Sequence, residues 1–406
     1  MATENNNKTL NVPNLRFPEF SGEWTKTLLN NYLEENKERN KRGIFTKNHV
    51  LSVSGDFGIV NQIELLGRSF AGKSVLDYHV VRTGNIVYTK SPLKEYPYGI
   101  VKVNGGVDGI VSTLYAVYKV KETANGKFVE YYFGLPNRTN RYFKPIVRIG
   151  AKHDMKIGND EVLANYVVFP CVDEQKRISD FICLLDERIA TQIKIIEDLK
   201  KLKSAISKHL FARKDLLETT ICLSDIATLK NGYAFQSSKY NPQGKWKILT
   251  IANVSGERYI NDEDCNCIIN LPSDIQNHQA LKEGNILISL TGNVGRVSLC
   301  KSGNYLLNQR VGLLQFTNNA NREFIYQVLS SRRFENNMIA CGQGAAQMNI
   351  GKGDVENFVL PYSTNANNIH LVANILRLYD EQIINEQRRL SLLTMHKQYL
   401  LTQMFI

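Results

Sequence analysis

The sequence lacks any long hydrophobic run. Nowhere do about 18 apolar residues follow one another, the length needed to span a membrane, and the polar start at residues 1–7 contains no hydrophobic signal region. We therefore expect a cytoplasmic protein without membrane contact. The seven cysteines are odd in number and scattered, so they do not indicate the disulfide framework of a small secreted protein.

Signatures of catalysis and of metal binding are also missing. The sequence has no C-x-x-C pair, no H-E-x-x-H zinc motif, no G-x-S-x-G nucleophile elbow and no Asn-Pro-Pro-aromatic motif of amino-methyltransferases. Its seven histidines are isolated, whereas a catalytic histidine needs a positioned partner. The sequence therefore predicts a binding protein that is not an enzyme and that holds neither a metal ion nor a cofactor of its own.

One motif points the other way. Residues 67–74 read G-x-x-x-x-G-K-S, the pattern of a P-loop, in which backbone N–H groups and a lysine bind phosphates. A P-loop follows a strand and precedes a helix, but the residues after Ser74 are rich in β-branched side chains and lead to a turn at Gly84. A stand-alone nucleotide-dependent enzyme therefore remains one alternative. A coiled-coil scaffold that binds only proteins is another.

A long helix is repeated in the chain. Residues 182–211 align without a gap with residues 376–405, which lie 194 positions later. Both copies place apolar residues at alternating steps of four and three, the seam of a coiled coil, and their polar interruptions recur as well. Two ordinary core helices are the alternative. The predicted seam residues are Ile182, Leu185, Ile189, Ile196, Leu199, Ile206 and Leu210 in the first copy, and Leu376, Tyr379, Ile383, Leu390, Leu393, Leu400 and Met404 in the second.

The repeat divides the chain into domain, helix, domain, helix. Short β-rich runs separated by glycine and proline precede each helix, which predicts two mixed domains. Short segments recur there too: residues 84–87 resemble 284–287, and residues 155–158 resemble 348–351. The expected boundaries are a disordered tail at 1–11, a first domain at 12–170, a first helix at 171–212, a second domain at 213–362 and a second helix at 363–406.

The chain is basic, with a formal net charge of +11 and a pI of about 9.1, which favours an acidic partner such as nucleic acid. Basic and amide side chains lie beside aromatic ones in loops of both domains. Such groups hold phosphates or read base edges, although each can also be a solvated surface residue. The candidate DNA-binding residues are Arg68, Lys73, Lys90, Lys94, Arg138, Arg141, Arg148 and Lys152 in the first domain, and Tyr233, Lys239, Lys245, Lys247, Arg258, Thr291, Asn293, Arg296, Asn308, Gln309, Arg310, Gln343 and Gln347 in the second.

Several segments of the chain have a distinctive sequence. They are residues 15–24, 223–235, 290–296 and 306–311, together with Pro170, Glu174, Gln175, Lys176, Arg177, Ile178, Leu185 and Asp186. These segments resemble the specificity subunits of type I restriction-modification enzymes, and the resemblance covers nearly the whole chain. The chain departs from the family's pattern in two respects. Asn85 and Asn285 stand where the family usually has Asp, and residues 363–368 open the second helix where the family would repeat Glu-Gln.

This resemblance implies a non-catalytic subunit with two target-recognition domains, each reading one half of a bipartite site in double-stranded DNA. It also implies that the two helices form an antiparallel spacer and dock two modification subunits, which methylate an adenine in each half-site with S-adenosylmethionine. Restriction subunits, with ATP and Mg²⁺, would join this core. The expected fold class is α+β: two mixed α/β target-recognition domains separated by two long antiparallel coiled-coil helices, with a pseudo-twofold internal repeat.

Overall fold

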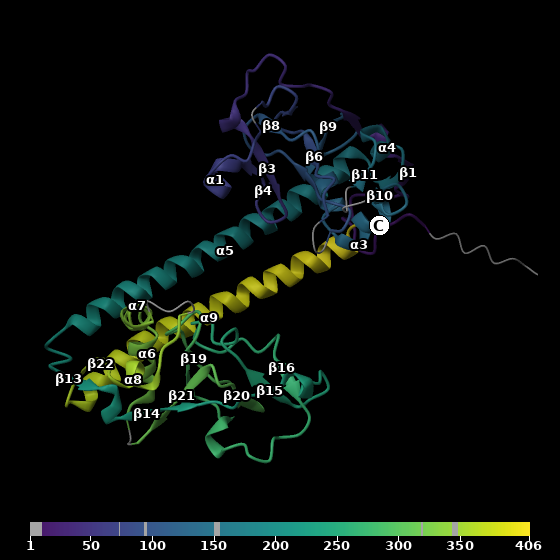
Figure 1. Cartoon of the computed structure of the whole chain (residues 1–406). Helices are drawn as coiled ribbons and strands as arrows, with labels where there is room; N and C mark the ends of the chain where they lie inside the picture. Colours follow the sequence, from purple (N-terminus) through teal and green to yellow (C-terminus); the bar gives the residue numbers. More distant parts are fainter. Residues whose placement is uncertain (1–9, 73, 93–95, 150–154, 318–319, 343–347) are drawn as a thin grey trace, which may run out of the picture. The chain divides into compact units, whose positions relative to one another are not determined.

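The computed structural model describes residues 10–72, 74–92, 96–149, 155–317, 320–342 and 348–406 (Figure 1). The chain divides into two compact units. Unit 1 consists of residues 1–191 and 390–406, and unit 2 consists of residues 192–389. Each unit therefore contains one mixed domain together with a part of each long helix.

Unit 1 is built on a four-stranded antiparallel sheet with the strand order β2-β9-β6-β7. Four two-stranded pairs, β1-β12, β3-β4, β5-β8 and β10-β11, accompany it. Its elements are β1 (Thr25–Leu28), β2 (Leu33–Glu35), β3 (Leu51–Ser54), β4 (Gly58–Asn61), α1 (Gln62–Leu66), β5 (His79–Val81), β6 (Ile86–Tyr88), β7 (Val101–Val103), β8 (Gly109–Val111), β9 (Ala116–Val120), α2 (Gly126–Tyr132), α3 (Pro136–Phe143), β10 (Arg148–Ile149), β11 (Met155–Lys156), α4 (Asn159–Leu163) and β12 (Tyr166–Phe169).

Unit 2 contains the corresponding antiparallel sheet, β14-β21-β18-β19, and the pair β13-β22. It has a second four-stranded sheet, β16-β15-β20-β17, in which β15 and β20 are parallel. Its elements are β13 (Thr219–Cys222), β14 (Ala227–Asn231), β15 (Trp246–Leu249), β16 (Asn266–Ile268), β17 (Ala280–Leu281), β18 (Ile286–Ser289), β19 (Val297–Leu299), β20 (Tyr305–Leu307), β21 (Val311–Phe316), α6 (Arg322–Leu329), α7 (Arg332–Cys341), α8 (Lys352–Glu356) and β22 (Val359–Tyr362).

The two domains share a frame that includes the caps of their helices. In both, the main sheet leads to two short helices, α2 and α3 in unit 1 and α6 and α7 in unit 2. Asn125 caps α2 by accepting a hydrogen bond from the Phe128 amide, and Asn321 caps α6 by accepting one from the Phe324 amide, both at 2.9 Å. An asparagine at the N-cap satisfies an amide that otherwise has no partner within the helix. The repeat therefore extends from the sequence to the local hydrogen bonding.

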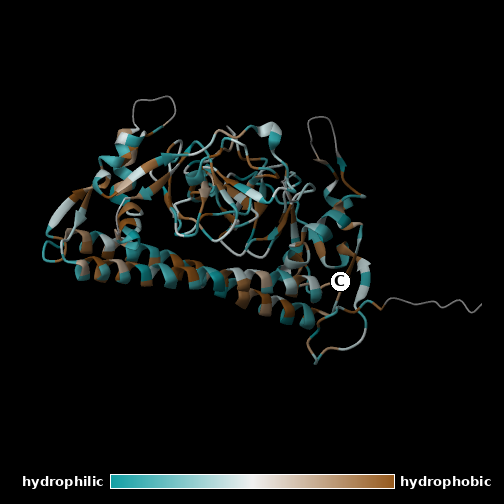
Figure 2. Ribbon diagram, turned by 90° about the horizontal axis from the view of Figure 1, so that it is seen from below, coloured by the Kyte–Doolittle hydropathy of each residue, from teal (hydrophilic) through white to brown (hydrophobic). Residues whose placement is uncertain are grey.

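The two long helices are α5 (Val172–Ala212) and α9 (Ala366–Gln403), with 41 and 38 residues. Hydrophobic and hydrophilic residues alternate along both of them, as Figure 2 shows. Every predicted seam residue is buried or half-buried. None of the helices within the described ranges is long and apolar enough to cross a membrane.

Polar contacts show that the helices run antiparallel within each unit. In unit 2, Gln192 Nε2 donates to Glu386 Oε2 at 2.7 Å, and Lys203 Nζ lies 2.6 Å from Asp380 Oδ1, so the partner numbers fall as the first numbers rise. In unit 1, Lys397 Nζ lies 2.5 Å from Asp186 Oδ1. Asp186 and Asp380 are equivalent in the repeat, as are Lys203 and Lys397. The same ion pair therefore forms once in each unit, as a pseudo-twofold repeat requires.

Both long helices contribute to the hydrophobic cores. In unit 1, Ile182 of α5 and Phe405, which follows α9, are buried in the core of the first domain, and the Phe405 ring stacks on Phe128 with centroids 5.0 Å apart. In unit 2, Leu210 of α5 and Leu376 of α9 are buried in the core of the second domain. Full burial of such a side chain stabilises by about 1.5–3 kcal/mol. The helices are therefore integral parts of both folded units.

His79 on β5 gives unit 1 a predicted dependence of stability on pH. Its side chain is 1% exposed, and burial, together with the charge of Arg39, lowers its pKa to about 4. Its Nδ1 atom has no hydrogen-bond partner among the described residues. The unfolded chain binds a proton here below about pH 6.5, and the folded chain does so only near pH 4. Stability is therefore complete above pH 6.5 and is lost as the pH falls towards 4.

We expect the free energy of unfolding of unit 1 to fall by about 2–3 kcal/mol between pH 7 and pH 4.5 through this residue. A His79→Leu variant should lose that part of the pH dependence, because leucine does not titrate. Urea unfolding of both proteins at the two pH values measures the difference. Equal losses in the two proteins would show that His79 does not couple folding to protonation.

Candidate nucleic-acid interface

Candidate residues of the second domain gather at one end of the sheet β14-β21-β18-β19. Strand β21 runs antiparallel to both β14 and β18. The carboxyl ends of β14 and β18 therefore lie at the same edge as the amino end of β21, and the segments that flank these ends meet there. We call the candidates on these segments the sheet-end surface, which comprises Tyr233, Thr291, Asn293, Arg296, Asn308, Gln309 and Arg310.

Backbone contacts hold the segments of the sheet-end surface together. The Gln309 amide donates to the Tyr233 carbonyl, and the Leu290 amide donates to the Arg310 carbonyl, both at 3.0 Å. A Cβ atom on Gly232 would lie 2.2 Å from the Asn308 carbonyl oxygen, so only glycine allows this close approach. The packed backbone therefore fixes where the side chains of this surface project.

The side chains of the sheet-end surface have the chemistry of base recognition. Asn293, Gln309 and Arg310 are exposed to solvent. Arg296 is 39% exposed, and its Nε atom lies 3.9 Å from Glu335, a long and weak pairing. Amide side chains can bind adenine and guanidinium groups can bind guanine through paired hydrogen bonds in the major groove. The surface thus offers both kinds of reading group on a rigid support.

The remaining candidates of the second domain lie elsewhere. Lys239 is exposed, and so is Lys245, whose Nζ atom lies 5.9 Å from the centroid of the Trp246 ring. Lys247 Nζ is 2.9 Å from Asp262 Oδ2, and this hydrogen bond raises the lysine pKa. Gln343 and Gln347 lie outside the described residues.

In the first domain the candidates are spread over several elements. Arg68 is exposed, with its guanidinium 4.6 Å from the centroid of the Phe70 ring. Arg141 on α3 and Arg148 on β10 are exposed as well. Lys90, at the end of β6, is half-buried and donates to the Ile157 carbonyl at 2.9 Å; burial lowers its pKa. Lys73, Lys94 and Lys152 lie outside the described residues.

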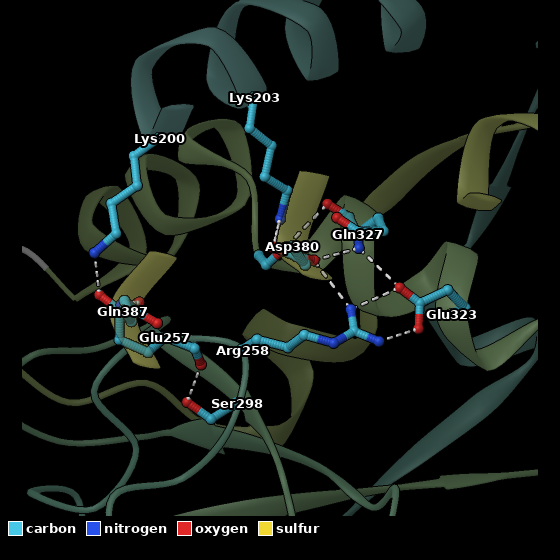
Figure 3. A network of polar contacts seen from close by, with 10 residues as sticks. Lys200, Lys203, Glu257, Arg258, Ser298, Glu323, Gln327, Asp380 and Gln387 are labelled. Atoms are coloured by element: carbon cyan, nitrogen blue, oxygen red, sulfur yellow. Dashed lines mark hydrogen bonds and ion pairs between the residues drawn. The ribbon is translucent and has the colours of Figure 1, made fainter. Parts of the chain in front are cut away.

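Arg258 is a correction to the predicted interface (Figure 3). Its side chain is 9% exposed and donates to both carboxylate oxygens of Glu323, at 2.8 and 2.7 Å, and to Asp380 Oδ2 at 3.0 Å. Although burial disfavours its charge, the bonds to Glu323 and the charge of Asp380 raise its pKa. Gln327 Nε2 also donates to Asp380, at 2.7 Å. Arg258 therefore joins the second domain to α9 and has no free surface for DNA.

Arg138 on α3 is a second correction. It is 9% exposed and donates to the carbonyl oxygens of Leu401, Phe405 and Ile406 at 3.2, 2.9 and 3.1 Å. These carbonyls lie at the end of α9, where the helix leaves acceptors unpaired and where positive charge is favourable. Burial lowers the Arg138 pKa to about 10. The side chain caps a helix and is not available to DNA.

The G-x-x-x-x-G-K-S pattern lies in a setting that differs from a P-loop. Helix α1 ends at Leu66 and is capped by Gly67, which has a φ of 74° and donates its amide to the Ile63 carbonyl at 2.8 Å. The pattern therefore begins as the C-cap of a helix. Among the described residues that follow Ser74, the next element is strand β5. A P-loop follows a strand and precedes a helix, whereas this segment follows helix α1 and precedes strand β5.

Comparison with known families assigns this second domain. The family model described as type I restriction modification DNA specificity domain matches residues 218–395. The second domain is therefore similar to this family. This match confirms the resemblance to specificity subunits and the predicted role in DNA recognition. Neither alternative, a nucleotide-dependent enzyme or a protein-only scaffold, is supported. The comparison with curated proteins gave no match.

Solved structures show a similar fold over nearly the whole chain. The crystal structure of the type-I restriction-modification system S subunit from M. genitalium has a TM-score of 0.58 and 15% identity, covering 97% of this chain and 99% of that chain. A structure described as the basis of complex assembly and conformational transition of the type I R-M system has a TM-score of 0.55 and 14% identity, covering 93% and 96%. The predicted fold class is therefore confirmed.

The first departure from the specificity-subunit pattern is explained by geometry. Asn85 Oδ1 accepts a hydrogen bond from the Arg82 amide at 3.0 Å, and Asn285 Oδ1 accepts one from the Lys282 amide at 2.8 Å. The contact requires only a side-chain oxygen that accepts a hydrogen bond, and asparagine and aspartate both have one. Asparagine therefore preserves this turn before β6 and β18.

The second departure is the missing Glu-Gln pair at the start of α9. A carboxylate from outside the helix, that of Glu218, lies there instead. Near the start of α5, Glu174 is 1% exposed and binds Arg16 at 2.7 Å. Near the start of α9, Glu218 from outside the helix accepts hydrogen bonds from the Thr364 amide and hydroxyl at 2.7 and 2.9 Å. Hydrogen bonds lower the Glu218 pKa to about 2. Each helix start thus has a carboxylate, supplied from a different place in the chain.

The structure adds four candidate residues that were not predicted from the sequence. Arg39 occupies the position in the first domain that Tyr233 occupies in the second, 194 residues later, and it is exposed. Phe235, Tyr240 and Leu271 line a cavity next to the sheet-end surface. The signal for Arg39 was the repeat offset itself. The aromatic spacing in residues 233–240 was the signal for the cavity.

Proposed function

We propose that the chain is the DNA-recognition subunit of a type I restriction-modification complex and that each mixed domain reads one half of a bipartite DNA site. The observation that carries this proposal is the DNA specificity domain at residues 218–395, which contains a rigid surface of exposed amide and guanidinium groups. The shared frame of the two domains supports the same role for the first. Their different loop sequences would then read different bases.

The proposal extends to partners and cofactors. The chain itself is non-catalytic in this scheme, and α5 and α9 space the two domains and dock two modification subunits. Those subunits hold S-adenosylmethionine, and restriction subunits hold ATP and Mg²⁺. Its location would be the cytoplasm. Support comes from the repeated helices, whose exposed faces carry apolar side chains such as Leu184 and Leu378 at equivalent positions, 63% and 57% exposed.

Exchange of one domain tests the division of labour. Replacing residues 213–362 with the equivalent domain of a relative that has another target should change the bases of one half-site and leave the other half-site unchanged. Sequencing of methylated sites in the assembled complex measures both. A change in both half-sites, or in neither, would contradict the proposal that each domain reads one half.

The sheet-end surface can be tested within the native domain. Alanine at Asn293, Arg296, Asn308, Gln309 and Arg310 should relax the preference at one half-site, because a bidentate base contact contributes about 1–3 kcal/mol of discrimination. Arg332→Ala is a matched control, since this arginine is 81% exposed and lies outside the surface. Unchanged base preference in the fivefold variant would show that the reading surface lies elsewhere.

A further inference from the structure

The second domain has a cavity beside the sheet-end surface, with a volume of about 530 Å³. This lies within the range of about 300–1,000 Å³ that is usual for small-molecule sites. Its lining includes the aromatic side chains Tyr233, Phe235 and Tyr240. Tyr233 belongs both to this cavity and to the sheet-end surface, so the two adjoin.

The walls of the cavity are held in place. The Tyr233 hydroxyl donates to Asp274 Oδ1 at 2.9 Å, which fixes the ring, and the Tyr233 and Phe235 rings lie 4.9 Å apart. The turn at residues 241–244 packs against another part of the lining, because a Cβ atom on Gly244 would lie 2.4 Å from the Ile268 backbone. The site is therefore formed without a ligand, and its aromatic faces need not be assembled on binding.

The chemistry of the lining suits a nucleotide. Lys239 is exposed at the cavity and can contact a phosphate. Asn241 and Asn270 supply amide groups that can bind the edge of a base, and Leu271 adds an apolar surface. Bases within a duplex present only their edges in the grooves, whereas aromatic rings contact the faces of bases that have left the stack.

We propose that this cavity receives one nucleotide of the bound DNA, turned out of the duplex, in the half-site read by the second domain. The inference rests on the proposed function, because it names how that half-site is bound. The base stacks against the aromatic wall while Lys239 holds its phosphate. A nucleotide whose base pair is already weakened costs less to turn out, so a mismatch at that position should favour binding.

The test uses the complex of this chain with its modification subunits and duplexes that contain the recognised site. At one position of this half-site, a mismatched pair should bind about tenfold more tightly than the matched pair. 2-Aminopurine at that position should brighten on binding, because its fluorescence rises when it leaves the stack. Leu271→Trp fills the cavity and should abolish both effects, whereas Val359→Trp, at an exposed residue outside the cavity, should change neither.

The outcomes separate the two proposals. Specific binding with no such position, or with both effects intact in Leu271→Trp, would overturn the nucleotide site and leave the DNA-recognition function standing. A complex that does not bind DNA specifically would overturn both. An adenine turned out into the modification subunit for methylation gives its own 2-aminopurine signal, and Leu271→Trp should leave that signal unchanged. An unchanged signal from that adenine, in the half-site read by the second domain, shows that the second domain of the variant is folded.

Discussion

The isolated chain is expected to transfer no methyl group to DNA, whereas the same chain mixed with its modification subunits should methylate adenine in both half-sites. The sequence has no Asn-Pro-Pro-aromatic motif, which amino-methyltransferases use. Enzymes accelerate their reactions by roughly 10⁶-fold or more, so the difference in methylation rate should be at least of that order. Transfer of labelled methyl groups from S-adenosylmethionine measures it.

The control for this experiment is the modification subunit alone, which should show no preference for the bipartite site. Mixing should restore both the rate and the site preference. Methylation of adenine by the purified chain without its partners would contradict the assignment of catalysis to another subunit. The experiment therefore separates recognition from chemistry.

Arg258→Ala is expected to lower the free energy of unfolding of unit 2 by about 3–5 kcal/mol, because it removes the cation shared by the buried carboxylate of Asp380 and the half-buried carboxylate of Glu323. Asp380 is 6% exposed and would keep only Lys203 and Gln327 as partners. Chemical denaturation, with hydrogen exchange of the amides in residues 192–389 as the readout, measures the loss of stability. The variant Arg213→Ala is the control, because its ion pair with Asp215 is exposed and contributes little.

A double-mutant cycle sharpens this prediction. Removing Asp380 together with Arg258 should cost less than the sum of the single changes, because the second change removes a buried charge that has already lost one of its two cations. If Arg258→Ala left stability unchanged but weakened DNA binding, the residue would return to the interface. Stability and DNA affinity therefore distinguish the two roles of this side chain.

The long helices could be predicted from sequence because their seam repeats locally, within a few turns. Lys203 and Lys397 could be identified in the sequence as a recurring polar position, but their partners Asp380 and Asp186 could not. Pairing across two helices depends on their relative direction and offset. Neither quantity is encoded in the spacing along one helix, so only the fold reveals these ion pairs.

The candidate interface was predicted less completely than the fold. The local sequence around an arginine does not show whether its side chain faces solvent, as that of Arg310 does, or is buried, as those of Arg138 and Arg258 are. Burial is decided by distant segments, such as the end of α9 for Arg138. The sheet-end surface emerged only because strand order brings three separate segments to one edge.

The polar pairs between the two long helices follow the symmetry of the repeat. Asp186 and Lys203 lie in the first repeat, yet each binds the equivalent of the other in the second repeat. A polypeptide with a single repeat would carry both the acid and the base, so two copies could satisfy each other. Gln192 meets Glu386, its own counterpart, which is the contact expected where a twofold axis crosses a dimer. The two repeats are therefore self-complementary at these positions, as two copies of a single repeat in a symmetric dimer would be.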